Sequence, residues 1–165
     1  VPSTQTFRHG NIVATIPAGI LMRDQIVMLR MIKDAYPERP IYLSNGGYGN
    51  AIGLGPYTLR QGLAEKLVDH PVVEGGDTLR IGGGMMDIKR SHDLWKIFGG
   101  PAAMIRRGNW VDRPSYGIPY GYAVTGMLIA EGLTTQNRME EVRPILKTVS
   151  AIAKAARIPD FTAGQ

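Results

Sequence analysis

The residues whose types are best suited to a functional role form an arginine and aromatic cluster in the C-terminal half of the chain. Its members are Arg106, Arg107, Trp110, Arg113, Tyr116 and Tyr120. Tryptophan, tyrosine and arginine are the residue types enriched where protein interfaces bind most tightly. The cluster therefore predicts a protein–protein interface. The competing interpretation is that the aromatic side chains belong to a core and the arginines are solvated.

Residue types that bind metals or act as nucleophiles are present without the spacing that either chemistry requires. The three histidines, His9, His70 and His92, are far apart and form no H-x-x-x-H pair, and the chain contains no cysteine. No serine stands in a G-x-S-x-G motif. We therefore predict no catalytic residue, no cofactor, no metal site and no enzymatic activity. A triad assembled only in space stays open, because its members need not be neighbours in sequence.

A glycine-rich stretch over residues 46–55 resembles a phosphate-binding loop in composition only. It lacks the Lys-Ser or Lys-Thr pair of a P-loop, and its glycines miss the G-x-G-x-x-G spacing by one residue. Since glycine tolerates positive φ, Asn45 to Gly49 is predicted to be a plain loop.

Four short motifs follow one another along the chain: YPERPIYL at 36–43, QGLA at 61–64, RRGNWVD at 106–112 and GIPY at 117–120. Their order resembles the soluble C-terminal region of glycosyltransferase-like bacterial membrane proteins, the domain-of-unknown-function family 2723. The resemblance runs from about Met28 to Arg157. It implies a severed soluble piece of a longer membrane precursor, and none of the family's catalytic motifs falls within it.

The resemblance implies two alternative functions. The first is a processed fragment that serves as a non-catalytic accessory subunit on the periplasmic face of a membrane protein assembly, for example a photosynthetic reaction-centre light-harvesting complex. The partners would then be subunits of that complex. The second is the soluble C-terminal domain of a membrane-bound glycosyltransferase that uses a lipid-linked sugar. The chain opens at Val1 with no initiator methionine or leader, as expected of a fragment cut from a precursor.

Composition is that of a globular protein long enough to bury a core, with 165 residues, 44% hydrophobic and 20% charged. The net charge of +5 is dispersed along the chain, and no nucleic-acid-binding motif accompanies it. No stretch approaches the roughly 20 apolar residues of a membrane span. We therefore expect no direct membrane span and no binding of nucleic acid; a periplasmic location, peripheral to the inner membrane, is what the resemblance implies.

The pattern of elements predicts an α/β fold, with α+β left open, in which a small sheet has flanking helices and the C-terminal end is a helical hairpin. We expect an extended arm over 1–10, one globular domain over 11–158 and a tail over 159–165. Strands are predicted at 41–43, and at 70–73 and 78–81 with a hairpin turn between these last two. Residues 11–16 are predicted to form a strand or a strapped segment. Leu59, Leu63 and Leu67 recur at helical spacing and predict a helix.

Further helices are predicted over 23–36, 87–98 and 116–133, and from 137 to 157. Pro37 and Pro159 stop the first and last of them. Asn137 and Glu140 have the spacing of a capping box, and Pro144 is expected to kink the last helix. The arginine and aromatic cluster lies partly in the connection between the second and third of these helices and partly at the start of the third.

Overall fold

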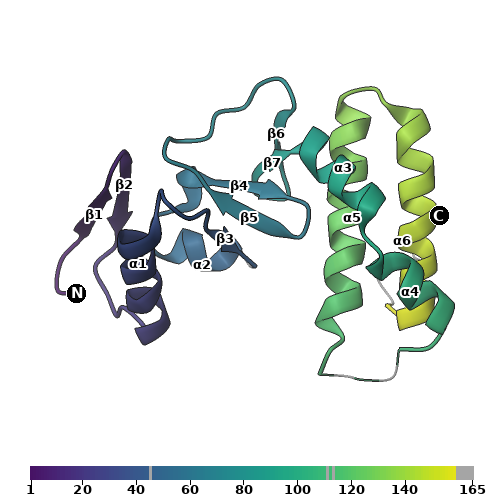
Figure 1. Ribbon diagram of the computed structural model, residues 1–165, viewed down its shortest axis with the longest axis horizontal. Coiled ribbons are helices and arrows are strands. Elements are labelled where there is room, and N and C mark those ends of the chain that lie inside the picture. The colour runs from purple at the N-terminus through teal and green to yellow at the C-terminus, as the bar shows by residue number, and fades with distance from the viewer. Residues whose placement is uncertain (45, 111, 113, 159–165) are drawn as a thin grey trace. The chain divides into compact units, whose positions relative to one another are not determined.

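The computed structural model describes residues 1–44, 46–110, 112 and 114–158 (Figure 1). The chain forms two compact units, an N-terminal unit, Val1–Asp87, and a C-terminal unit that begins at Ile88. None of the described helices is both long and apolar enough to cross a membrane. The predicted division into an extended arm, one globular domain and a tail is a statement about which parts fold independently, and it stays a prediction. The tail, 159–165, lies outside the described residues.

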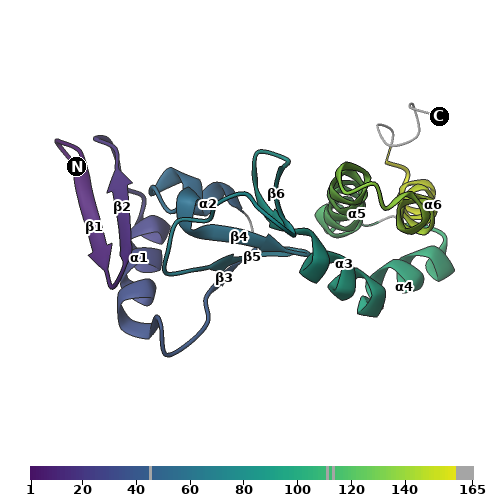
Figure 2. The ribbon, with the colours of Figure 1, turned by 90° about the horizontal axis from the view of Figure 1, so that it is seen from above.

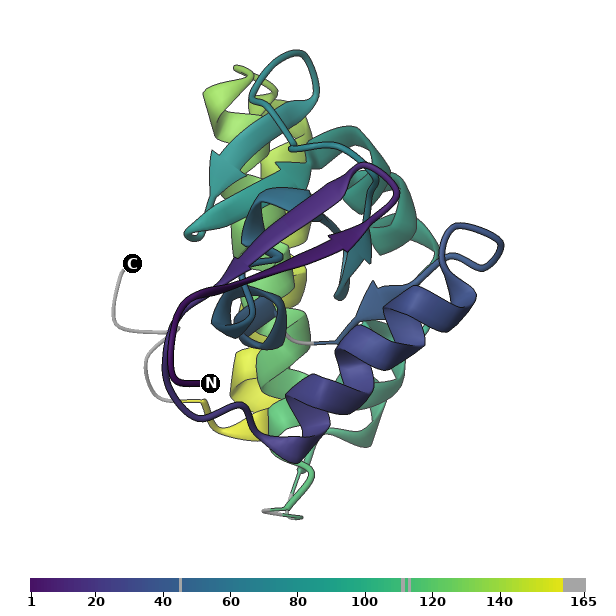
Figure 3. The same ribbon diagram turned by 90° about the vertical axis from the view of Figure 1, so that its left-hand side faces the viewer.

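The N-terminal unit opens with a hairpin of β1 (Gln5–His9) and β2 (Ile12–Ile16), which pair antiparallel. Residues 5–9 of the expected arm are therefore a paired strand. In β2, alternate side chains are buried and exposed, as a strand with one covered face requires. Helix α1 (Arg23–Ala35) follows, as predicted, and lies close to this hairpin in Figure 3.

A five-stranded sheet makes up most of the rest of this unit, with the order β3-β5-β4-β7-β6. The strands are β3 (Tyr42–Leu43), β4 (Thr58–Gln61), β5 (Ala64–Leu67), β6 (Thr78–Ile81) and β7 (Gly84–Asp87). All neighbours are antiparallel except β4 and β7. A core cluster joins the hairpin, α1 and the sheet, and its buried members are Ile12, Ala14, Ile32, Ile52, Leu54, Tyr57 and Leu67.

The predicted helix through Leu59, Leu63 and Leu67 is wrong, because these residues span the β4–β5 hairpin. Gly62, with φ 64°, is the first of the two residues between Gln61 and Ala64. Glycine in that place favours a two-residue hairpin turn whose backbone twist matches the strands. A spacing of four residues fits one face of a strand as well as one face of a helix, so the leucines alone could not decide.

Two further predictions in this unit are corrected. The glycine-rich stretch is not a plain loop: residues 46–51 form the short helix α2 (Gly46–Ala51), which is followed by a turn of 3-10 helix, η1 (Gly55–Tyr57). The prediction at Asn45 lies outside the described residues. The 70–73 segment is not a strand; β6 instead pairs with β7 around Gly82 and Gly83, whose φ values of 59° and 80° suit a two-residue turn.

The C-terminal unit contains only helices among its described residues, and three of them were predicted. The helices are α3 (Ile88–Ile97), α4 (Gly100–Arg107), α5 (Gly117–Thr135) and α6 (Met139–Ala156). The three that were predicted are α3, α5 and α6. Helices α5 and α6 form the expected hairpin and lie side by side in Figures 1 and 2. The mixed α/β class with a C-terminal helical pair is therefore confirmed.

Small residues let these helices approach closely. A Cβ atom on Gly126 of α5 would lie 2.4 Å from Cγ2 of Val149, and one on Gly132 would lie 2.2 Å from Cδ1 of Ile88. The predicted capping box is wrong in detail, since the N-cap of α6 is Arg138 and Asn137 precedes it with φ 59°. Helix α4 was not predicted; it begins with Pro101 in its first turn, where a proline costs no hydrogen bond.

Candidate functional site

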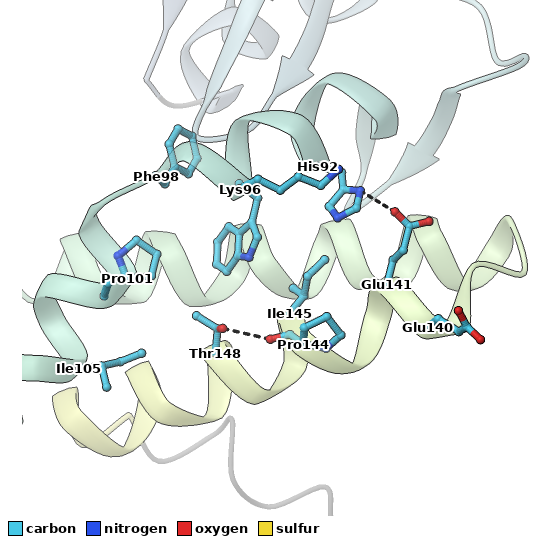
Figure 4. A pocket seen from close by; sticks show the side chains of 12 residues that line it. His92, Lys96, Phe98, Pro101, Ile105, Glu140, Glu141, Pro144, Ile145 and Thr148 are labelled. Carbon is cyan, nitrogen blue, oxygen red and sulfur yellow. Dashed lines mark hydrogen bonds and ion pairs between the residues drawn. The ribbon is translucent and has the colours of Figure 1, made fainter.

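The C-terminal unit contains a pocket of about 530 Å³ between α3, α4 and α6 (Figure 4). We call it the helical pocket. Its lining residues are His92, Trp95, Lys96, Phe98, Pro101, Ala102, Ile105, Glu140, Glu141, Pro144, Ile145 and Thr148. The volume falls in the range of protein sites that hold a small ligand or a few side chains of a partner.

Helical periodicity explains why these residues meet in one place. On α3 the lining positions are 92, 95 and 96, on α4 they are 101, 102 and 105, and on α6 they are 140, 141, 144, 145 and 148. Residues three and four apart lie on one face of a helix. Each of the three helices therefore presents a single face to the same pocket.

The floor of the pocket is apolar. Trp95 and Ile145 are buried, and Phe98 and Pro101 extend the apolar surface toward α4. Ile105 stays 37% exposed on α4 although it is a large apolar residue. An apolar ligand would remove this surface from water, which is favourable by about 25 cal/mol for each Å² buried.

One end of the pocket is polar and centres on Glu141. The Glu141 carboxylate accepts hydrogen bonds from Nε and Nη2 of Arg138, at 2.6 and 2.9 Å, and lies 3.2 Å from Nδ1 of His92. The bonds from Arg138 hold the pKa of Glu141 below its usual value. Burial, followed by the positive charge of Lys96, lowers the pKa of His92, so this histidine is neutral at pH 7 while Glu141 is charged.

The remaining polar groups divide into paired and unpaired ones. Oγ1 of Thr148 donates to the backbone oxygen of Pro144 at 3.0 Å, and Nζ of Lys96 lies 3.3 Å from a carboxylate oxygen of Asp93. The exposed carboxylate of Glu140 pairs with no described residue. Glu140 is therefore the charge at the pocket that a ligand can take without displacing a partner.

Five of the six residues predicted as an interface are described; they lie in the same unit, and none of them lines the helical pocket. The guanidinium carbon of Arg107 lies 5.5 Å from the centre of the Trp110 ring, a cation–π distance. Tyr116 and Tyr120 stack with ring centres 6.4 Å apart. Arg106 is exposed, and Arg113 lies outside the described residues.

Trp110 combines features of both interpretations offered for this cluster. Its side chain is half-buried, and its backbone N–H donates to the oxygen of Ala155 at 3.2 Å. Its Nε1 is buried and has no hydrogen-bond acceptor among the described residues. The arginines beside it are exposed, so the cluster is part core and part surface, and its role as an interface stays a prediction.

Sequence reasoning considered several residues of the helical pocket singly and assigned them other roles. The sequence indicates only that His92 stands far from the other histidines and that Glu140 has capping-box spacing from Asn137, and it predicts no role for Glu141. The signal that could have united them was the matched spacing on three helices. Across 1–44, 46–110, 112 and 114–158, no three metal-ligating side chains gather into a metal site. The three histidines contact different partners, Tyr36, Asp69 and Glu141.

Comparison with models of known protein families, with curated proteins and with solved structures finds no match for this chain.

Proposed function

We propose that this protein is a non-catalytic interaction module whose helical pocket binds an apolar segment of a partner protein that also carries a lysine or arginine. The single observation behind this proposal is the composition of the pocket, an apolar floor with an unpaired carboxylate, Glu140, at its rim. The partner that we propose is a membrane protein assembly, which the protein would meet as a peripheral subunit on the periplasmic face.

The apolar floor supports recognition of a hydrophobic side chain or helix face. Side chains from α3, α4 and α6 surround the same space, and Ile105 leaves apolar surface uncovered at its edge. Filling such a pocket with one aliphatic or aromatic anchor contributes about 1.5–3 kcal/mol. Anchors of this kind in well-packed pockets dominate the affinity of protein interfaces.

The polar end supports a cationic group next to that anchor. Glu141 already has Arg138 and His92 as neighbours, whereas Glu140 has no described partner. A lysine or arginine of the partner would form an ion pair with Glu140 at the rim. Rim charges contribute more to orientation and association rate than to affinity.

The interactions that the polar groups of the pocket already make favour binding rather than catalysis. His92 faces Glu141 through Nδ1, and the Thr148 hydroxyl donates to a backbone oxygen of its own helix. Neither arrangement pairs a nucleophile with a base. The alternative role, a soluble domain of a lipid-linked sugar transferase, stays a prediction.

Two neighbouring alanines on α4 allow a matched test in the full chain. Ala102 and Ala103 are both exposed, and only Ala102 lines the pocket. We expect Ala102→Trp to fill the pocket and abolish comigration of the chain with a large complex in blue-native gels of source-cell membranes. Ala103→Trp should comigrate as the unmodified protein does.

A photo-crosslinking amino acid placed at 102 in the full chain should give a product whose partner peptide combines apolar residues with a lysine or arginine. Equal comigration of the two tryptophan variants, or migration of the unmodified chain alone, would contradict the proposal. So would a crosslinked peptide that carries no basic residue.

A further inference from the structure

The N-terminal unit contains its own pocket, of about 440 Å³, which we call the polar pocket. It lies between α2, η1, the β4–β5 hairpin and the β6–β7 turn. The lining residues are Gly47, Asn50, Gly55, Pro56, Thr58, Arg60, Glu65, Val72, Arg80, Gly82, Gly83, Gly84 and Met85. Glycines and polar side chains dominate this lining, in contrast to the apolar floor of the helical pocket.

Strand alternation and pairing bring the charged side chains together. Thr58 and Arg60 stand two apart on β4 and so share a face, and Glu65 is opposite Arg60 on β5. Nη2 of Arg60 lies 3.1 Å from Oε1 of Glu65, with the two side chains 27% and 12% exposed. One largely buried ion pair therefore forms part of the wall and holds the Arg60 guanidinium in place.

Arg80 on β6 supplies a second guanidinium at the same pocket. Its side chain pairs with no described residue, although its backbone N–H lies within reach of Glu74. Two arginines against one glutamate leave the pocket with an excess positive charge. Guanidinium groups bind phosphoryl groups particularly well, because two parallel N–H donors match two phosphate oxygens.

The glycines make room for a ligand close to the backbone. Gly82 and Gly83 both have positive φ in the β6–β7 turn, and no atom lies within 4 Å of where a Cβ on Gly83 would stand. A Cβ on Gly55 would lie 2.1 Å from Oδ1 of Asn50, so the Asn50 amide lies directly against the backbone of η1. Asn50 thus adds a neutral hydrogen-bonding group to the charged ones, whereas the Thr58 hydroxyl already donates to the backbone oxygen of Gly55 at 3.0 Å.

We propose that the polar pocket binds a small phosphate ester that also carries hydroxyl groups, the chemistry of a sugar phosphate. Arg80 would bind the phosphoryl group, with Arg60 beside it. Glu65 and Asn50 would accept hydrogen bonds from the hydroxyls. A ligand with hydroxyl groups would therefore use the Glu65 carboxylate, whereas a bare anion would not. The proposal is independent of the helical pocket and of its partner.

Titration of the full chain with glucose 6-phosphate, followed by calorimetry and by backbone amide NMR, tests the proposal. We expect saturable binding with amide shifts at Gly82, Gly83 and Gly84, weaker binding of inorganic phosphate, and weaker binding of free glucose. Arg80→Gln should weaken glucose 6-phosphate binding by about tenfold, since charge-assisted hydrogen bonds are lost. Arg8→Gln, which changes another exposed strand arginine of the same unit outside the pocket, should leave binding unchanged.

Three results would overturn the proposal. These are no saturable binding of glucose 6-phosphate at millimolar concentration, equal affinity for inorganic phosphate, or equal weakening by Arg8→Gln and Arg80→Gln. Thermal unfolding of each variant shows whether it is folded. Arg60 is unsuitable as the test position, because its removal would leave Glu65 largely buried without its partner.

Discussion

Nδ1 of His92 on α3 lies 3.2 Å from Oε2 of Glu141 on α6, and this contact joins two helices of the C-terminal unit at one end of the helical pocket (Figure 4). Lys96 and Asp93 on α3 and Arg138 before α6 are the other charged groups that act on the imidazole. Burial is the largest influence and lowers the pKa of His92 below the ordinary value of 6.5. The contact at neutral pH is therefore between a neutral imidazole and a carboxylate.

Acidification should destabilise the protein through His92. Between the ordinary pKa of 6.5 and the lower pKa in the fold, the unfolded chain binds a proton that the folded protein does not. The free energy of unfolding should therefore decrease as the pH falls below about 6.5, and level off below the folded pKa. Urea denaturation between about pH 5 and 7 measures this dependence.

His92→Gln is the variant that isolates this effect. It should flatten the pH dependence in that window. Carboxylates with lowered pKa values, such as Glu141 and Asp93, lose their contribution only at lower pH, below their ordinary values of 4.5 and 3.8. An unchanged slope in His92→Gln would refute the assignment to this residue.

Glu141→Gln should lower the pKa of His92 further. The negative charge of Glu141 favours the protonated imidazole, so its removal leaves burial and Lys96 less opposed. NMR titration of the imidazole signals measures the shift. Glu140→Gln is the matched control, because it removes the neighbouring carboxylate, which has no described partner, and should leave the His92 pKa unchanged.

Alanine substitutions at two glycines of α5 should have opposite effects. A Cβ on Gly126 would meet Val149 at 2.4 Å and the Trp95 ring at 2.9 Å, so Gly126→Ala should destabilise the protein by about 1–3 kcal/mol. No atom lies within 4 Å of a Cβ on Gly121. Gly121→Ala should therefore stabilise it by about 1 kcal/mol through helix propensity alone. Chemical denaturation distinguishes the two, and equal effects would contradict the close approach at Gly126.

Tyr57→Phe should destabilise the N-terminal unit. The Tyr57 hydroxyl accepts a hydrogen bond from the backbone N–H of Val13 at 3.1 Å and donates to the Val13 oxygen at 3.3 Å. Its loss would leave both backbone groups of β2 without this partner, at a cost of about 1–3 kcal/mol. Tyr42→Phe alters a tyrosine that is half exposed and should change stability little. A phenylalanine variant at 57 with unaltered stability would show that water replaces the hydroxyl.

Much of the fold could be predicted because its signals were local. Pro37 marked the end of α1, and Asn137 located the turn before α6 within two residues. The strands in 12–16 and 78–81 followed from residue type and alternation. These elements depend on periodicity and on residues that end a helix, both of which a single sequence carries.

The wrong predictions arose where the local sequence preference was ambiguous or where the surrounding structure outweighed it. The leucines at 59, 63 and 67 fitted a helix and a hairpin equally, and the turn at Gly62 decided between them. Glycines of low helix propensity nevertheless form α2, since the surrounding structure outweighs propensity over so few residues. The helical pocket was missed for a different reason: its faces belong to three helices, and no sequence pattern says which helices pack together.

Both edge strands of the five-stranded sheet are short. One edge is β3, two residues long and preceded by Pro40, and the other is β6, four residues long with Arg80 exposed on it. Short edges, prolines and exposed charges are the devices by which proteins prevent strand addition between molecules. The sheet thus offers little template for the addition of a strand from a second molecule.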